Sequence, residues 1–267
     1  MLSLHTNAAA LSTQNALGGT QKALSNSMTR LGTGYRVNSA MDDAAGLQIA
    51  TRLNAQTRGM AVAQRNTQNG ISMMQTAEGA FAEVTDILLR MKDLATESAN
   101  GTASTEDKAA LKAEFDALGL EMGNILDNTT FGGAKLLNGG TLAASIDFQI
   151  GATTAEVMTV DVSAALGAVT APTAIGAAAD IDTIATAINN VGTLRSQLGA
   201  ASNRLDHVYN NLANMRTNTD AAKGRIMDVD YASETANMTS KQMLMQASSS
   251  MLKQSSSMSQ LVMSLMQ

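Results

Sequence analysis

Asp42 and Asp43 are the side chains of this sequence closest to a catalytic pair, because two neighbouring carboxylates can divide acid and base roles between them. Adjacent helical residues, however, point about 100° apart, and no His or Lys lies nearby in the sequence. Acidic side chains are favoured at the start of a helix by its dipole. We therefore interpret both residues as helix-start charges.

Histidine, cysteine and glycine patterns supply no other catalytic or binding site. The histidines are His5 and His207, and cysteine is absent, which leaves too few ligands for a metal centre built from these residues. The glycine pairs at 132–133 and 139–140 lack the spacing and the following Lys-Ser/Thr of a phosphate-binding loop, so we interpret them as turns. We expect no catalytic residue, no metal and no cofactor.

Composition favours long helices. The hydrophobic share is 45%, the aromatic share is 3%, and Pro172 is the single proline. Such a core is filled by aliphatic side chains, and few positions oblige a helix to end. The net charge of −5 and the lack of a basic stripe argue against a nucleic-acid partner. No run of 18 apolar residues exists for membrane insertion, and residues 1–10 lack the pattern of a secretory signal.

Both ends of the chain carry apolar residues at seven-residue spacing, with very little charge between them. Heptad spacing keeps one face of a helix against a partner. Helices with so few charges are poorly suited to water, so we expect the two ends to pair as a separate coiled-coil module that copies of the same molecule bury. The expected subunit-packing positions are Leu4, Leu11, Leu17, Leu24, Leu31, Leu244, Met245, Met251, Leu252, Met258 and Leu265.

The methionines of these stripes have two interpretations. Because its side chain is unbranched and flexible, methionine can line a binding groove that adapts to different partners. At repeating seam positions, we interpret it as a packing residue. The last helix can combine both roles if it binds a chaperone before assembly and sister subunits afterwards.

The interior of the chain predicts three further helices and one hairpin. The helices run from about Asp42 to Ala99, from Ser104 or Thr105 to a break at Asn128, and from Asp180 to Asn218. Asn38 and Ser39 offer N-cap side chains for the first of these. Alternating apolar residues at 146–150 and 158–162 predict a β-hairpin, which we expect to cap one end of the bundle.

The expected fold is therefore mainly α, a long-helix coiled-coil bundle with one small β-hairpin, and a separate module formed by the terminal helices. We expect three parts, which are residues 1–40 with 227–267 as the terminal coiled coil, residues 41–140 with 173–226 as the helical bundle, and residues 141–172 as the hairpin and a connection within the bundle domain.

Long sequence signatures lie toward both ends of the chain. The N-terminal signature is Leu31–Ala50, LGTGYRVNSAMDDAAGLQIA. The C-terminal signature includes Leu198–Leu205, LGAASNRL, then Asp228–Ala232, DVDYA, and Val262–Leu265, VMSL. These segments resemble the signatures of bacterial flagellins, occur in that family's order and include both arms of the chain.

This resemblance implies a structural subunit of the flagellar filament, which is exported unfolded through a type III channel and assembles into an extracellular tube for motility. The implied partners are further copies of the chain, an export chaperone at the C-terminal helix, the filament cap and hook-associated proteins. Residues 164–179 alone separate the hairpin from the following helix, so the variable outer domains of longer flagellins are expected to be absent. Ser259 stands where flagellins often carry proline.

The resemblance also implies an epitope for a vertebrate innate receptor at Arg90, Leu94 and Glu114. The neighbouring Leu89 is apolar where well-recognised flagellins have Gln.

Three alternative functions differ in what they require of the sequence. A hook-filament junction protein shares the terminal coiled-coil plan but has weaker flagellin signatures. A membrane-active type III effector needs a long apolar stretch or a strongly basic amphipathic face, and neither occurs here. A flagellin with a grafted metalloprotease needs a zinc motif, which this sequence lacks.

Overall fold

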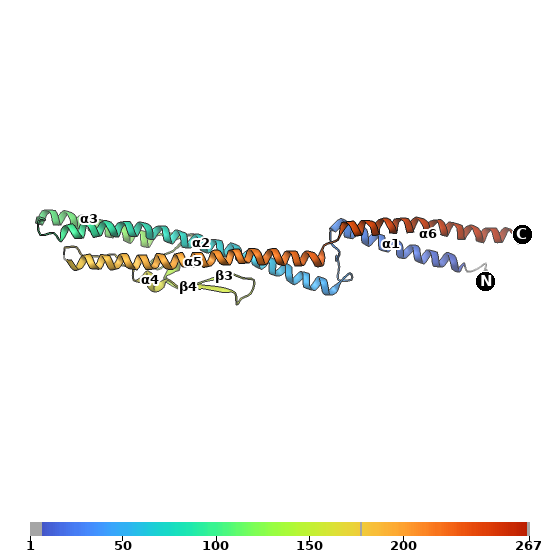
Figure 1. Cartoon of the computed structure of the whole chain (residues 1–267), viewed down its shortest axis with the longest axis horizontal. Helices are drawn as coiled ribbons and strands as arrows, with labels where there is room; N and C mark the ends of the chain where they lie inside the picture. Colours follow the sequence, from blue (N-terminus) through green and yellow to red (C-terminus); the bar gives the residue numbers. More distant parts are fainter. Residues whose placement is uncertain (1–6, 177, 266–267) are drawn as a thin grey trace. The chain divides into compact units, whose positions relative to one another are not determined.

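The structure is a computed structural model that describes residues 7–176 and 178–265, with the backbone alone at 178–179 and 258–265. It is mainly helical, as the sequence predicts (Figure 1). Its helices are α1 (Ala8–Thr33), α2 (Ala44–Ser98), α3 (Thr105–Asn128), α4 (Ser163–Gly167), α5 (Ala178–Met227) and α6 (Tyr231–Leu265), with a 3-10 turn η1 (Thr141–Ala143). Its strands are β1 (Thr130–Phe131), β2 (Ala134–Lys135), β3 (Ile146–Gln149) and β4 (Val157–Val160).

The chain divides by internal packing into two compact units. One unit comprises Met1–Ala55 and Asn218–Gln267, and the other comprises Gln56–Thr217. Residues 40 and 227, where the sequence suggested a boundary, both lie within the first unit. Helices α2 and α5 each contribute residues to both units.

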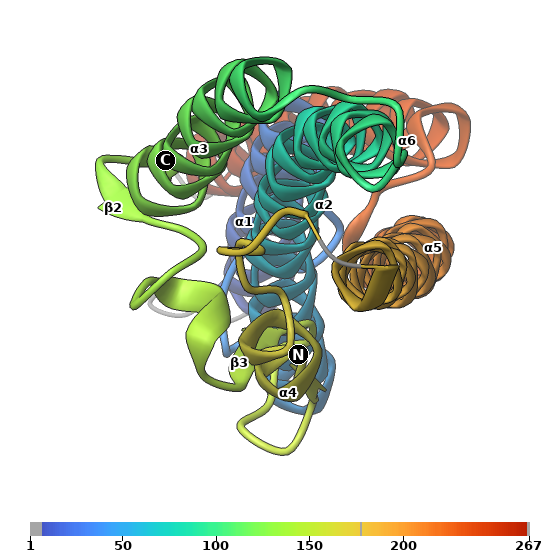
Figure 2. The ribbon, with the colours of Figure 1, turned by 90° about the vertical axis from the view of Figure 1, so that its left-hand side faces the viewer.

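The second unit has the larger core, formed where α2, α3 and α5 pack together (Figure 2). Along α5, one row of apolar residues seven positions apart is buried throughout, as coiled-coil packing requires. These residues are Ile184, Val191, Leu198, Leu205 and Leu212. The first four share a core with the buried residues Phe81, Val84, Leu88 and Met91 of α2 and with Phe115 and Met122 of α3. Leu212 packs in a second, smaller cluster with Met60 and Ala63 of α2. Helix α3 begins at a capping box in which Ser104 Oγ accepts from the Asp107 amide at 3.1 Å.

The predicted hairpin is confirmed as β3–β4, with Ile146 opposite Val160 and Phe148 opposite Met158. Its expected place at one end of the bundle is wrong, because it lies along the side of α2. There Asn66 Nδ2 donates to the carbonyl of Gln149 at 3.4 Å, and Phe148 packs beside Gly70. Helix α3 has 24 residues and α2 has 55, so α3 leaves part of α2 uncovered, and the hairpin covers it.

Four small elements between α3 and α5 were not predicted, namely β1, β2, η1 and α4. A two-residue loop at Gly132 and Gly133 joins β1 to β2, and both glycines have positive φ, 61° and 86°. This left-handed geometry agrees with their interpretation as turn glycines. The short α4 lies at the start of the segment interpreted as a connection, and its Leu166 belongs to the core. A five-residue helix is too short for its periodicity to be detected in a sequence.

Candidate functional site

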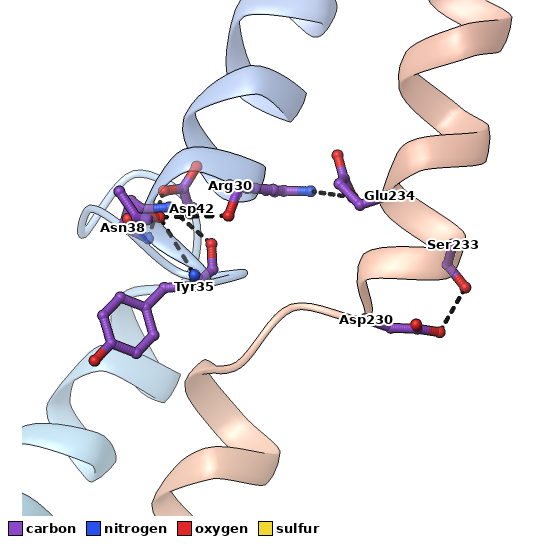
Figure 3. Close-up of polar contacts among 8 residues, drawn as sticks. Arg30, Tyr35, Asn38, Asp42, Asp230, Ser233 and Glu234 are labelled. Atoms are coloured by element: carbon purple, nitrogen blue, oxygen red, sulfur yellow. Dashed lines mark hydrogen bonds and ion pairs between the residues drawn. The ribbon is translucent and has the colours of Figure 1, made fainter.

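The terminal helices α1 and α6 pair side by side, as the sequence predicts (Figure 1). Asn7 caps α1 by accepting from the Ala10 amide at 3.1 Å, and its Nδ2 donates to the carbonyl and the hydroxyl of Ser255, both at 3.2 Å. Nearer the other end of the pair, Arg30 Nη1 lies 3.8 Å from Oε2 of the buried Glu234 (Figure 3). Polar contacts therefore fix the register of the two helices at both ends.

One apolar track of each helix is covered within this pair. On α1, Leu24 is buried and Leu17 and Leu31 are half-buried. On α6, Met238, Met245 and Leu252 are half-buried and recur every seven residues. Each of these tracks is a row of apolar residues seven positions apart, which is the spacing of coiled-coil packing.

Further apolar side chains of the pair remain exposed. Of the predicted subunit-packing residues, Leu11, Leu244 and Met251 are exposed, whereas Leu17, Leu24, Leu31, Met245 and Leu252 belong to the covered track. Leu4 and the side chains of Met258 and Leu265 lie outside the described residues. Met28 and Met243 are also exposed, although they are not among the subunit-packing residues predicted from the sequence. Met28 follows Leu24 by four residues, which is the sequence signal for a residue beside the seam.

The segments that lead into α2 and α6 are joined by backbone hydrogen bonds. Tyr35 and Asp228 form an antiparallel bridge, the Arg36 amide donates to the carbonyl of Met227 at 2.6 Å, and the Val229 amide donates to that of Gly34 at 3.0 Å. Gly34 has a φ of 76°, which glycine adopts without strain. The Arg36 guanidinium also donates to the carbonyl of Ile226 at 2.8 Å. This junction lies within the first unit.

Asp42 and Asp43 accept hydrogen bonds from the turn before α2 and from the start of α2. Asp42 Oδ2 accepts from the amides of Asn38 and Ser39 and from the Ser39 hydroxyl, at 3.1, 2.9 and 3.1 Å (Figure 3). Hydrogen bonds from the Ser39 and Asn38 amides hold the pKa of Asp42 below its ordinary value. Asp43 Oδ1 accepts from the Gly46 amide at 2.8 Å, as a helix-capping side chain does.

The expected N-cap role of Asn38 and Ser39 is therefore wrong. Helix α2 begins at Ala44, too far along the chain for either side chain to reach its first amides. Asp230 has an equivalent role before α6, where it accepts from the Ala232 amide at 3.1 Å and from the Ser233 hydroxyl at 2.7 Å (Figure 3). The hydrogen bond from the Ser233 side chain is the main cause of the lowered pKa of Asp230.

The three residues of the implied receptor epitope have different environments. Arg90 of α2 and Glu114 of α3 form an exposed ion pair, with Nε and Nη2 of Arg90 at 2.8 and 2.6 Å from Oε1 of Glu114. This hydrogen-bonded contact raises the pKa of Arg90. Leu94, in contrast, is 1% exposed and belongs to the bundle core. The side chain of Leu94 is therefore not available to a partner while the bundle is folded, whereas the neighbouring Leu89 is exposed.

Among the described residues, no group of three His, Asp or Glu side chains is placed to hold a metal ion. His207 is exposed, and His5 lies outside the described residues. None of the described helices combines the length and the apolar character needed to cross a membrane.

Comparison with known proteins relates both arms of the chain to one family. Residues 4–141 match the bacterial flagellin N-terminal helical region, and residues 181–266 match the bacterial flagellin C-terminal helical region. A flagellin of Halalkalibacterium halodurans is 41% identical over 247 residues, which cover 90% of each chain. Flagellin C of Vibrio cholerae serotype O1 is 34% identical, over 95% of this chain and 96% of the relative.

The alignment with the Vibrio protein spans 364 positions, which exceeds the 267 residues of this chain, so that relative contains segments with no counterpart here. Among solved structures, one assigned as a flagellar hook-associated protein of Vibrio parahaemolyticus has a TM-score of 0.56 to this chain. It covers 70% of this chain and 100% of its own at 16% identity, a likeness of fold alone.

Proposed function

Because this chain belongs to the bacterial flagellin family, we propose that it polymerises through the outward apolar residues of α1 and α6, which neighbouring copies cover in the filament. The chain is a structural subunit of the flagellar filament, and its family forms that filament outside the cell. The proposal concerns which residues hold the subunits together.

The main support for this proposal is the exposure of Leu11, Leu244 and Met251. All three are exposed although they lie on heptad tracks, so packing within one chain does not explain them. Burying a side chain of this kind is worth about 1.5–3 kcal/mol. A helical polymer repeats this gain at every subunit, which favours assembly over the free chain.

The small core of the helix pair also supports export in an unfolded state. Among the described residues of α1 and α6, the buried ones are Leu24, Ser27 and Glu234. So little burial offsets only part of the conformational entropy lost on ordering two long helices, at about 1–2 kcal/mol per residue. We propose that α6, whose methionines adapt to different partners, binds an export chaperone, and that the filament cap and hook-associated proteins contact the same module.

Seeded polymerisation of the full chain tests the proposed surface. Leu244→Asp places a charge on the outward side of α6, and Leu252→Asp places one in the covered track. We expect both variants to stop filament growth, because a buried unpaired charge is costly. Gln242→Asp is the control, since it adds the same charge at an exposed polar position of the same helix.

Electron microscopy gives the outcome, and circular dichroism establishes that each variant retains its bundle. Filaments from Leu244→Asp at the yield of the control would contradict the proposed surface. The absence of filaments from the unmodified chain would instead contradict polymerisation itself.

We further propose that the Arg90–Glu114 pair is the accessible part of a receptor-recognised surface. A cell-reporter assay should show lower potency for Arg90→Ala, with the thermal stability unchanged because the pair is exposed. Leu94→Ala removes a buried side chain and should lower the free energy of unfolding by about 2–5 kcal/mol. Unchanged potency in both variants would rule out this surface.

A hook-filament junction protein is the second candidate, because the solved structure with the similar fold is a hook-associated one. Junction proteins form short zones and not long filaments. Electron microscopy after seeding separates the two functions, since long tubes are expected only from a filament subunit.

A further inference from the structure

Methionine supplies three of the six exposed large apolar side chains described on α1 and α6. Met28 is 51% exposed, Met243 is 61% exposed and Met251 is 66% exposed, and the other three residues are Leu11, Tyr231 and Leu244. We propose that oxidation of these three methionines to methionine sulfoxide is a modification that prevents the subunit from polymerising. The inference rests on the proposed role of the outward apolar residues in assembly.

The position of Met28 connects the modification to the helix pair itself. Met28 lines a groove between α1 and α6 together with Leu24, Met245 and Gly18. Leu24 is the buried residue of the α1 seam, and Met245 belongs to the covered track of α6. Polar residues, among them Gln21 and Lys22, also line this groove. An oxygen atom added to the Met28 sulfur therefore lies beside the apolar seam of the helix pair.

Exposure makes the reaction selective for the methionines of the helix pair over those in the core of the second unit. Peroxide oxidises a thioether readily only where it can reach the sulfur. The core of the second unit contains methionines that are all buried, namely Met60, Met73, Met74, Met91, Met122 and Met158. Met41 and Met215 are exposed, but they lie in the turn before α2 and on α5. A mild dose of oxidant thus modifies the helix pair and leaves the bundle core unchanged.

The oxidant is a hydroperoxide, for which hydrogen peroxide is the probe. A lone pair on the methionine sulfur attacks one peroxide oxygen, so that a sulfur–oxygen bond forms and the oxygen–oxygen bond breaks. The departing hydroxide takes the remaining proton and leaves as water. The sulfur is oxidised by two electrons and the peroxide is reduced by two.

The product is incompatible with an apolar contact between subunits. Methionine sulfoxide is polar, and its oxygen is a hydrogen-bond acceptor that loses its water when it is buried. With three such groups in every subunit, the concentration needed for polymerisation should rise by at least about tenfold. The change is reversible, because methionine sulfoxide reductases of the two stereospecificities restore the thioether.

The test uses the full chain as a monomer, treated with hydrogen peroxide and then freed of it. Peptide mass spectrometry should find sulfoxide at Met28, Met243 and Met251 before it appears at the buried methionines. Seeded polymerisation of the treated protein should fail, and treatment with both reductases should restore it. In assembled filaments, the same three methionines should oxidise more slowly than Met41.

A variant with Met28→Leu, Met243→Leu and Met251→Leu should polymerise with and without peroxide, because leucine has a similar volume and is not oxidised. Met41→Leu is the matched control and should remain sensitive. Normal polymerisation of the fully oxidised chain, or equal sensitivity of the triple variant, would overturn the inference. If the triple variant does not polymerise even without peroxide, the inference is tested by the oxidised unmodified chain, whose polymerisation the reductases should restore. Failure of the untreated chain to polymerise would refute the proposed function and not the oxidation chemistry.

Discussion

At the scale of single residues, the carboxylates of this protein hold turns and helix ends in place. Asp42 accepts three hydrogen bonds from the turn that precedes α2, Asp43 caps α2, and Asp230 caps the start of α6. The hydrogen bonds to Asp42 and Asp230 favour the ionised carboxylate and lower the pKa of both residues. The acidic pair that first suggested acid–base chemistry is therefore part of the junction beside α1 and α6.

Asp42 gives a prediction about pH. Its lowered pKa means that the ionised carboxylate stabilises the turn fully above the ordinary value of 3.8, and that this contribution is lost as the pH falls through the lower folded-state pKa. NMR titration of the Asp42 carboxyl should give a pKa below 3.8. Ser39→Ala should raise that pKa only in part, because the amide bonds from residues 38 and 39 remain. A pKa at or above the ordinary value in the unmodified chain would contradict the hydrogen bonding described.

At the scale of elements, the close approach of the hairpin to α2 depends on a glycine. A Cβ atom at Gly70 would lie 2.9 Å from Cε1 of Phe148 and 3.2 Å from Cδ1 of Leu205. Gly79 lies nine residues further along α2, and a Cβ atom there would meet nothing within 4 Å. Substitution by alanine is thus expected to lower the free energy of unfolding at Gly70 and to raise it at Gly79.

Gly70→Ala should lower the free energy of unfolding by about 1–3 kcal/mol, because the hairpin must move away from α2. Gly79→Ala should raise it by about 0.5–1 kcal/mol, because alanine loses less backbone entropy in a helix. Denaturant unfolding of the full chain, followed by circular dichroism, measures both. Equal effects of the two substitutions would show that the hairpin does not pack where the structure places it.

At the scale of the whole molecule, the two units differ in how much they bury. The bundle unit buries a continuous core that extends over α2, α3, α5 and the hairpin. The terminal pair buries Leu24 and little else among its described apolar residues. Local stability follows burial, so the two units should open with very different free energies.

Hydrogen exchange of the monomer should therefore show fast exchange of the amides of α1 and α6 and slow exchange at residues 181–216. After polymerisation, the same helices should become protected, because neighbouring copies cover their outward residues. Removal of either arm should abolish polymerisation and leave the bundle protected. Uniform protection along the monomer would contradict this division.

The local periodicity of the sequence predicts much of this fold. Repeats of three and four residues located the long helices, and alternation at 146–150 and 158–162 located the hairpin. The flagellin signatures in the sequence indicated the family that the comparisons establish. The pairing of the chain ends followed from their low charge and their matching heptads.

Tertiary structure alone decided which partner covers each face. A heptad shows that Leu244 and Met251 share one side of α6, but it does not show that Met245 and Leu252 are the residues covered by α1. The burial of Leu94 depends on the helices packed around α2. Periodicity specifies the residues that share a face, because it is a property of one helix. Burial requires a second surface, and its position is a property of the assembled fold.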